Sequence, residues 1–193
     1  MKKSYDITTN SAIFKRIATA ELPPERTTYE GYRFSDCSFG NANLSGLNFM
    51  NCVFENCDLS LASLRQTSLK EVRFLRCKLL GIQFGECNKF LLQLGFEQCM
   101  IRLSTFCGLN LRNTVFEGCD LQEADFSEAD LSGAVFGHCD LHRATFFRSN
   151  LEKADFRSAY GYSIPPESNR LKKARFSMPD VLGLLDGYGI EIE

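Results

Sequence analysis

Large apolar residues recur at every fifth position along most of the chain. The first run extends from Tyr29 to Phe84 and the second from Phe96 to Phe156, and 13 of the 17 Phe residues lie on these positions. A helix repeats its apolar residues every three to four positions and a half-buried strand every second position, so neither explains a period of five. The pattern predicts a solenoid whose chain turns a corner after every five residues and points one large side chain per side inward.

A second periodic position lies two residues before each large residue and is mostly small: Ala, Cys, Ser or Thr. A narrow, closely packed interior has room for one large and one small side chain per side. Eight of the nine cysteines follow this register, and only Cys107 lies outside it. We therefore expect eight buried, reduced cysteines, which behave as small apolar residues, and an exposed Cys107.

The spacing of the cysteines indicates the length of one coil. Within each of two sets, neighbouring cysteines are separated by four five-residue repeats. The sets are Cys37, Cys57 and Cys77, and Cys99, Cys119 and Cys139. Four sides of five residues make such a coil, with neighbouring rungs about 4.8 Å apart. That distance permits disulfides, but the absence of an export signal argues against them.

The stretches DLQEADFSEADLSGAVF (120–136) and NLEKADF (150–156) resemble the A(D/N)LxX motif of the pentapeptide repeat family. The resemblance covers residues 29–159. It implies an all-β fold, a right-handed quadrilateral β-helix, with a little over six coils and a length of about 30 Å at one β-spacing per coil.

Three segments divide the expected domain: an N-terminal cap over 1–28, the β-helix over 29–176, and a C-terminal cap over 177–193. The interval from Phe84 to Phe96 exceeds two repeats by two residues, so the register breaks over 85–95. The apolar residues of this break favour either a bulge that covers the seam between two stacks or a ledge that contacts a partner.

Both ends of an open β-helix expose core and backbone, so they need cover. At the N-terminus, Ile13, Phe14 and Ile17 with the Leu22-Pro23-Pro24 segment predict a short cap. At the C-terminus, Ser177 followed by Asp180 is typical of a capping box and Gly187 of a helix end. We expect a short capping helix over about 178–186 and a strand over 189–193, with Val181, Leu182 and Leu185 toward the core.

Composition limits the classes of function. The formal net charge is −2, which argues against bulk affinity for nucleic acid. The first residues contain no apolar core of signal-peptide length, and no run of about 18 apolar residues could span a bilayer. We expect a soluble cytoplasmic protein without membrane contact.

Residues for catalysis or metal binding are scarce. His138 and His142 fall on different sides of a five-residue coil, and we find no phosphate-binding loop, nucleophile elbow or metal-ligand cluster. A convex shaft also offers no water-excluded pocket. The chain is therefore not expected to be an enzyme, and no cofactor or metal is expected.

Charge separates into two bands along the chain. The acidic band contains Glu117, Asp120, Glu123, Asp125, Glu128, Asp130 and Asp140, with no Lys or Arg among them. The basic band contains Arg65, Lys70, Arg73, Arg76 and Lys78 around the single acid Glu71. Asp120 and Asp140 are separated by four repeats, like neighbouring cysteines of one set. We therefore expect these two aspartates to stack on one side of the coil.

Two interpretations of the acidic band remain open. Asp and Asn before each large residue bond local backbone groups at corners. Alternatively, spaced carboxylates on a rod mimic a nucleic-acid duplex, which carries about one charge per 1.7 Å of axis. Such a rod would dock in the DNA-binding groove of another protein.

A narrower resemblance favours the second interpretation. Residues 63–81, SLRQTSLKEVRFLRCKLLG, and residues 171–193, LKKARFSMPDVLGLLDGYGIEIE, resemble the matching stretches of albicidin-resistance and microcin-immunity pentapeptide proteins. The wider group includes the Qnr and MfpA proteins. The resemblance implies binding to DNA gyrase or topoisomerase IV as a DNA mimic, with resistance to drugs that target these enzymes and without direct contact to nucleic acid.

The same resemblance implies a tail-to-tail homodimer through the C-terminal segment. The apolar residues expected at this interface are Val181, Leu182, Leu184, Leu185, Ile190 and Ile192. The alternative function is a structural scaffold that binds another cytosolic protein through the basic band or the 87–94 ledge.

Overall fold

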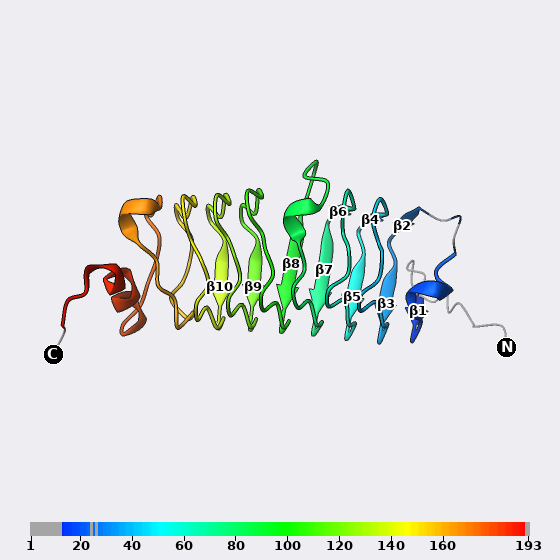
Figure 1. Ribbon diagram of the computed structural model, residues 1–193, viewed down its shortest axis with the longest axis horizontal. Helices are drawn as coiled ribbons and strands as arrows, with labels where there is room; N and C mark the ends of the chain where they lie inside the picture. Colours follow the sequence, from blue (N-terminus) through cyan, green and yellow to red (C-terminus); the bar gives the residue numbers. More distant parts are fainter. Residues whose placement is uncertain (1–12, 24, 26, 192–193) are drawn as a thin grey trace.

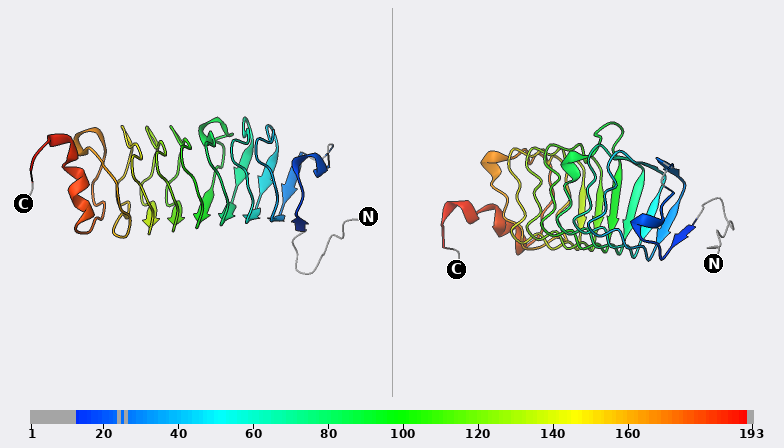
Figure 2. Two further views of the ribbon diagram at one scale, coloured as in Figure 1. Left: turned by 60° about the horizontal axis from the view of Figure 1, so that its bottom comes forward. Right: turned by 45° about the vertical axis from the view of Figure 1, so that its right-hand side comes forward.

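The chain winds into a long rod of successive coils, seen from the side in Figure 1 and from two further directions in Figure 2. The computed structural model describes residues 13–23, 25 and 27–191. The rod is a β-solenoid of about six turns. The β-helix expected from the five-residue period is therefore confirmed.

In the described part of the chain, ten short strands form two parallel sheets, because each strand pairs with its equivalent one coil away. The larger sheet has the order β1-β3-β5-β7-β8-β9-β10. Its strands are β1 Ile13–Lys15, β3 Arg33–Ser35, β5 Val53–Glu55, β7 Val72–Leu75, β8 Leu94–Glu97, β9 Val115–Glu117 and β10 Val135–Gly137. The smaller sheet contains β2 Thr28–Glu30, β4 Asn48–Met50 and β6 Ser68–Lys70.

We number the four sides of the coil in chain order. Side 1 carries the three-stranded sheet and side 2 the seven-stranded sheet. Sides 3 and 4 are held by isolated parallel bridges, such as Asp58↔Lys78 on side 3 and Asn43↔Ser63 on side 4. Five short 3-10 helices complete the described elements: η1 Thr19–Glu21, η2 Phe84–Glu86, η3 Pro166–Ser168, η4 Asp180–Leu184 and η5 Asp186–Tyr188.

The pairing register confirms the coil of four repeats and its break. Phe34 pairs with Phe54 and Phe54 with Phe74, each one regular coil further along the chain. Phe74 pairs with Phe96, which lies two residues further along the chain than a regular coil would place it. Phe96 and Phe116 are again separated by one regular coil. The two additional residues therefore lie within a single coil.

Aromatic rings fill the interior in columns. On side 2, neighbouring ring centroids from Phe34 to Phe176 lie between 4.6 and 5.4 Å apart in stacked pairs. On side 4, the column from Phe84 to Phe146 has spacings of 4.7 to 5.2 Å. Rings of the opposite sides 2 and 4 meet edge to face, as Phe106 and Phe116 do at 5.8 Å and 85°. Both geometries are favourable for aromatic pairs.

The small interior positions satisfy the backbone of the preceding coil. The Thr67 hydroxyl donates to the Leu44 carbonyl at 2.9 Å, and the Ser149 hydroxyl donates to the Phe126 carbonyl at 2.9 Å. The Cys57 thiol donates an equivalent but weaker hydrogen bond to the Phe34 carbonyl at 3.3 Å. A small donor at this position is thus favoured both by space and by a buried carbonyl that needs a partner.

The cysteines lie where the sequence predicted. All nine are free, eight are buried and Cys107 is exposed. Burial raises the pKa of the Cys52 thiol, and burial together with the nearby Glu86 raises the pKa of Cys87 to about 12. These two thiols stay protonated at neutral pH, as expected of core residues.

The stack begins before residue 29. Strand β1 pairs with β3, and the Phe14 ring stacks on that of Phe34 at 5.3 Å. Part of the segment expected as a cap therefore continues the rungs of side 2, while Leu22 packs against the core. Pro24 lies outside the described residues.

The C-terminal segment differs from the expected capping helix. Residues 180–184 and 186–188 form the 3-10 helices η4 and η5 rather than one α-helix. The Ser177 hydroxyl donates to the Arg157 carbonyl instead of capping a helix, and the left-handed terminal residue is Gly189, not Gly187. Gly183 and Gly187 both disfavour a continuous helix.

Close packing of Gly183 explains how the segment covers the shaft. A Cβ atom at Gly183 would overlap the Tyr162 carbonyl oxygen, so only glycine fits there. The Gly183 carbonyl in turn accepts a hydrogen bond from the Ile164 amide at 3.1 Å. Among the described residues, 189–191 form no strand, contrary to the expectation, and residues 192–193 lie outside them.

Candidate functional site

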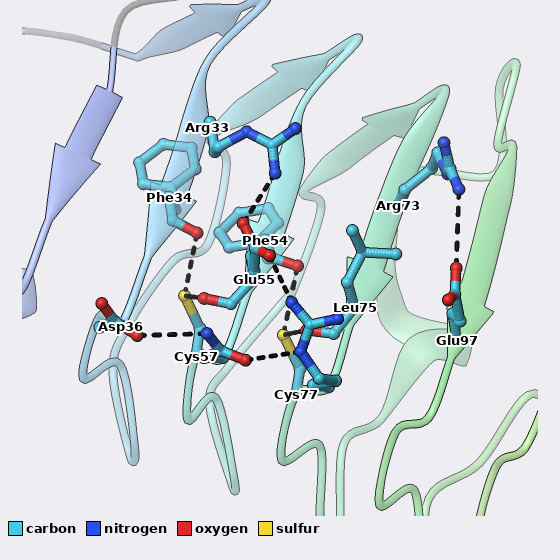
Figure 3. Close-up of polar contacts among 12 residues, drawn as sticks. Arg33, Phe34, Asp36, Phe54, Glu55, Cys57, Arg73, Leu75, Cys77 and Glu97 are labelled. Atoms are coloured by element: carbon cyan, nitrogen blue, oxygen red, sulfur yellow. Dashed lines mark hydrogen bonds and ion pairs between the residues drawn. The ribbon is translucent and has the colours of Figure 1, made fainter. Parts of the chain in front are cut away.

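Charged side chains on side 2 form a ladder across successive coils in the first half of the shaft. Arg33 donates to Glu55 at 2.8 Å, and Arg73 lies 3.8 Å from Glu97; Figure 3 shows both pairs. Arg76 forms a second ion pair with Glu55. The charges on this face compensate one another, so its field is weak.

The basic band predicted from the sequence is distributed around the shaft. Arg73 and Arg76 lie on side 2 and are paired, as described above. Arg65 lies on side 4, Lys70 on side 1 and Lys78 on side 3, and none of the three has an ion pair within the described residues. The structure therefore does not gather the band into one patch.

The acidic band likewise encircles its coil, because a run longer than one full coil covers all four sides. Glu117 lies on side 2, and the Asp120↔Asp140 bridge places these two on side 3 as expected. The other members follow the same order: Glu123 at the end of side 3, Asp125 and Glu128 on side 4, and Asp130 on side 1.

The four aspartates of the band support the turns. Each accepts a hydrogen bond from the backbone amide two residues later, at 3.3 Å for Asp120, 2.8 Å for Asp125, 3.0 Å for Asp130 and 3.1 Å for Asp140. This is the local bonding expected of Asp at a corner. The structure thus bears out the first interpretation of these residues.

Several band carboxylates are also paired with cations or donors. Arg102 bonds Asp120 at 2.5 Å, Arg112 lies 3.8 Å from Asp130, and His138 contacts Glu117 at 2.8 Å. Burial raises the pKa of the Asp140 carboxyl, but hydrogen bonds from His142 and Gln122 outweigh it and hold this pKa below its ordinary value. The two histidines lie on different sides, as predicted.

Three acids remain without an ion pair in the described part of the chain: Glu123, Asp125 and Glu128. Glu123 and Glu128 are exposed, and Asp125 is half-buried. Glu123 lies at the corner between sides 3 and 4, Asp125 on side 4, and Glu128 at the following corner, all within one coil. We call these three residues the carboxylate edge.

A group of cations follows the carboxylate edge and was not recognised from the sequence. Arg143, Arg148 and Lys153 occupy successive corners with φ of 58°, 55° and 62°, and all three are exposed. Arg148 lies over the half-exposed Phe147 ring at 5.0 Å. A spacing of five residues would have identified them as corner positions.

The register break is on side 1 and projects as a loop between β7 and β8 (Figure 1). Phe90 and Leu91 are 67% and 63% exposed, whereas Leu94 is buried and Leu92 packs against the core. The outer residues thus form a ledge, and the inner ones cover the seam.

The apolar residues of the C-terminal segment are only partly covered. Val181, Leu182, Leu184 and Leu185 are half-buried, and Ile190 is 55% exposed. Ile192 lies outside the described residues.

Within residues 13–23, 25 and 27–191, no three His, Cys, Asp or Glu side chains are arranged to hold a metal ion. None of the helices in that part of the chain is long and apolar enough to cross a bilayer.

Comparison with known proteins identifies the repeat. The sequence profile of the pentapeptide repeat region matches residues 27–90 and 89–156. No curated protein matches the sequence. A solved structure of QnrB1, a plasmid-mediated fluoroquinolone resistance protein, is 20% identical over 94% of this chain and 97% of its own, with a TM-score of 0.49. HetL, a pentapeptide repeat protein involved in heterocyst differentiation in the cyanobacterium Nostoc sp. strain PCC 7120, is 17% identical over 86% of this chain and 84% of its own, with a TM-score of 0.45.

Proposed function

This chain belongs to the pentapeptide repeat family, and we propose that it acts by binding another protein as a mimic of duplex DNA rather than by catalysis. The proposed partner is a type II topoisomerase, DNA gyrase or topoisomerase IV. Occupation of the enzyme's DNA-binding groove by the shaft would protect the enzyme from drugs that act on its DNA complex.

The carboxylate edge is the observation that carries this proposal. Glu123, Asp125 and Glu128 present three charges on a single coil without an ion pair in the described residues. Their backbone is held by the coil ladder, since the Glu123 and Glu128 amides donate to the His142 and Phe147 carbonyls at 3.0 and 2.8 Å. Fixed charges on a rigid rod bind a basic groove with little loss of conformational entropy.

The dimensions of the shaft are compatible with this role. Successive rungs of the coil lie about 4.8 Å apart, and phosphates of one DNA strand lie about 3.4 Å apart along the axis. The distance between rungs is thus comparable to the distance between phosphates. The stacked Asp120 and Asp140, which contact Arg102 and His142, lie beside the edge on side 3.

The choice of topoisomerase rests on the resemblance of residues 63–81 and 171–193 to the resistance and immunity proteins of the family. A supercoiling assay with DNA gyrase, with and without a gyrase poison, tests it. We expect the chain to bind the enzyme and to restore supercoiling in the presence of the poison. Absence of a complex, of inhibition and of protection with both enzymes would refute the proposal.

A charge variant tests the carboxylate edge itself. The E123Q/D125N/E128Q variant keeps the side-chain shapes, and the amide oxygen that replaces the carboxylate at position 125 can still accept the Ser127 amide hydrogen bond. We expect the complex to weaken at least about tenfold, because complementary charges govern both steering and register. The matched control E30Q/E71Q/E86Q also removes three acids, all outside the edge, and should bind like the unmodified chain.

We further propose that two chains associate tail to tail through residues 178–191. The partly covered Leu182 and Leu185 and the exposed Ile190 support this arrangement, because unpartnered apolar surface favours association. Analytical ultracentrifugation should show a dimer that Ile190→Glu converts to a monomer. Leu61→Glu, at a 63% exposed position far from the tail, is the control; a monomeric unmodified chain would contradict the dimer.

A further inference from the structure

Side 1 is split at the register break. Its backbone ladder reaches the Ser68↔Asn88 bridge and resumes only at Asn110↔Asp130. In the described chain no backbone hydrogen bond joins residues 88–92 to 109–113. In the regular coils, corner amides such as that of Asn51 donate to the next coil, here to the Lys70 carbonyl at 2.9 Å. Within the described residues, the corresponding amide of Leu91 and the amide of Asn110 have no backbone partner of this kind.

The split opens a hollow of about 680 Å³ on the surface of side 1. The two rungs below it contribute Met50 and Asn51, and Lys70 and Glu71. The ledge contributes Lys89, Leu91, Leu92, Gln93 and Leu94, and the rung above contributes Asn110, Arg112, Asn113 and Thr114. This volume is within the range of sites that enclose small ligands or short peptide segments.

The lining of the hollow is basic. Lys70, Lys89 and Arg112 surround it, whereas Glu71 is the sole acid among its lining residues. Lys89 donates to the Gly108 carbonyl at 3.2 Å, and Lys70 lies over the Phe90 ring at 5.4 Å from its centroid. Neither lysine has a carboxylate partner within the described residues, so both charges can meet an anionic ligand.

Apolar surface accompanies these charges. Phe90 and Leu91 are exposed on the ledge, and Leu92 lines the hollow beneath them. Exposed apolar residues that are rimmed by polar ones mark interaction sites more often than isolated exposed residues do. Cationic, apolar and unpaired backbone groups therefore converge at one place.

We propose that this hollow binds an extended acidic and apolar segment of a protein partner. Its backbone would add to the interrupted ladder of side 1, as peptides add to free sheet edges. Its carboxylates would face Lys70, Lys89 and Arg112, and an apolar side chain would contact Leu91. This site lies on a different side of the shaft from the carboxylate edge and does not depend on the proposed topoisomerase function.

A peptide fits these observations better than a nucleic acid does. Binding to a phosphate backbone requires an extended positive field, while the chain as a whole carries a formal charge of −2. An alternating peptide uses the cations, the leucines and the open ladder together.

Fluorescence anisotropy with labelled eight-residue peptides tests the proposal. The probes alternate Val with Glu, Gln or Lys, and a ten-nucleotide oligothymidine is the fourth probe. We expect saturable binding of the Glu peptide, at least about tenfold weaker binding of the Gln and Lys peptides, and weakening of the complex by salt. On binding, hydrogen exchange of the Asn110 amide should slow.

Variants locate the site. K89E/R112E should weaken binding of the Glu peptide at least about tenfold, and Leu91→Asn, which tolerates the left-handed backbone at this position, should weaken it severalfold. The control K172E/K173E reverses two exposed lysines further along the same side and should have no effect. Failure of the Glu peptide to bind, equal binding by K89E/R112E, or preference for oligothymidine would each overturn the proposal.

Discussion

Sides 1 and 2 of the shaft meet the same two-residue insertion and respond in opposite ways. On side 2, β7 and β8 pair through four residues across the break, and the Phe74 and Phe96 rings remain stacked at 5.4 Å. On side 1, the ladder is interrupted and the additional residues project outward. Side 2 thus keeps its register across the break, and side 1, where the additional residues lie, takes up the insertion.

This difference predicts that the stacked rings of side 2 stabilise the fold, whereas the exposed ledge residues contribute to binding and little to stability. Replacing Phe96, which is buried on side 2, by Ala should lower the free energy of unfolding by about 3–5 kcal/mol, since it leaves a cavity between stacked rings. Replacing the exposed Phe90 by Ala should change it by less than about 0.5 kcal/mol. Urea denaturation measures both, and similar losses for the two variants would break the comparison.

A smaller effect is expected at the polar group that joins the two stacks on side 4. The Ser104 hydroxyl donates to the Leu79 carbonyl at 2.7 Å and accepts from the Ile82 amide at 3.0 Å, both across the break. Ser104→Ala should lower the free energy of unfolding by about 1–3 kcal/mol, because two buried backbone groups lose their partner. Ser127→Ala, at an outward position, is the control; equal effects would contradict the assignment.

Removing the insertion should sharpen the comparison further. Deletion of Lys89 and Phe90 restores the five-residue period and places Leu91 at the inward position of side 1. We expect the free energy of unfolding to rise by about 1–2 kcal/mol, since burial of a leucine contributes about 1.5–3 kcal/mol before ordering costs. The same deletion should close the hollow and abolish binding of the Glu peptide. A loss of stability would show that the ledge is required for the stack.

The smallest expected effect is a dependence on pH. The Arg157 guanidinium beside Asp155 holds the pKa of that carboxyl below its ordinary value. A depressed pKa contributes stability that is present above the unfolded pKa of about 3.9 and is lost as the pH falls through the folded value. Asp155→Asn on side 2 should therefore flatten the acid limb of the stability curve, by less than about 1 kcal/mol for a surface pair. Glu71→Gln on side 1, where no ion pair is present among the described residues, is the control, and an equal change of the limb in both variants would contradict the assignment to Asp155.

The interior of this protein could be predicted almost entirely from the sequence, because one period specifies it. The five-residue spacing of Phe and Leu placed the columns, and the regular spacing of the cysteines identified the coil. Cys107 was correctly separated from the buried cysteines, since it alone lacks the small-residue register.

The surface could be predicted only in part, because contiguous residues occupy different sides. The acidic band from Glu117 to Asp140 is continuous in the sequence but encircles the shaft. Pairing across coils was also invisible in the sequence, for example between Arg102 and Asp120. The cationic corners at Arg143, Arg148 and Lys153 could have been found by applying the same five-residue period to charges.

The C-terminal cap was the least predictable segment. Local signals at Ser177 and Gly187 indicated an α-helix, but tertiary packing of Gly183 against Tyr162 determines the path of the chain. Short 3-10 turns allow that contact, and the sequence does not reveal which residue Gly183 packs against.

A competition experiment tests DNA mimicry most directly. Fluorescently labelled chain is bound to DNA gyrase, and unlabelled linear duplex DNA is added in increasing amounts. If the carboxylate edge occupies the DNA-binding groove, duplex DNA must displace the chain completely, and E123Q/D125N/E128Q must be displaced at lower DNA concentrations. Formation of a ternary complex of gyrase, DNA and the chain, with no displacement at saturation, would contradict the proposed function.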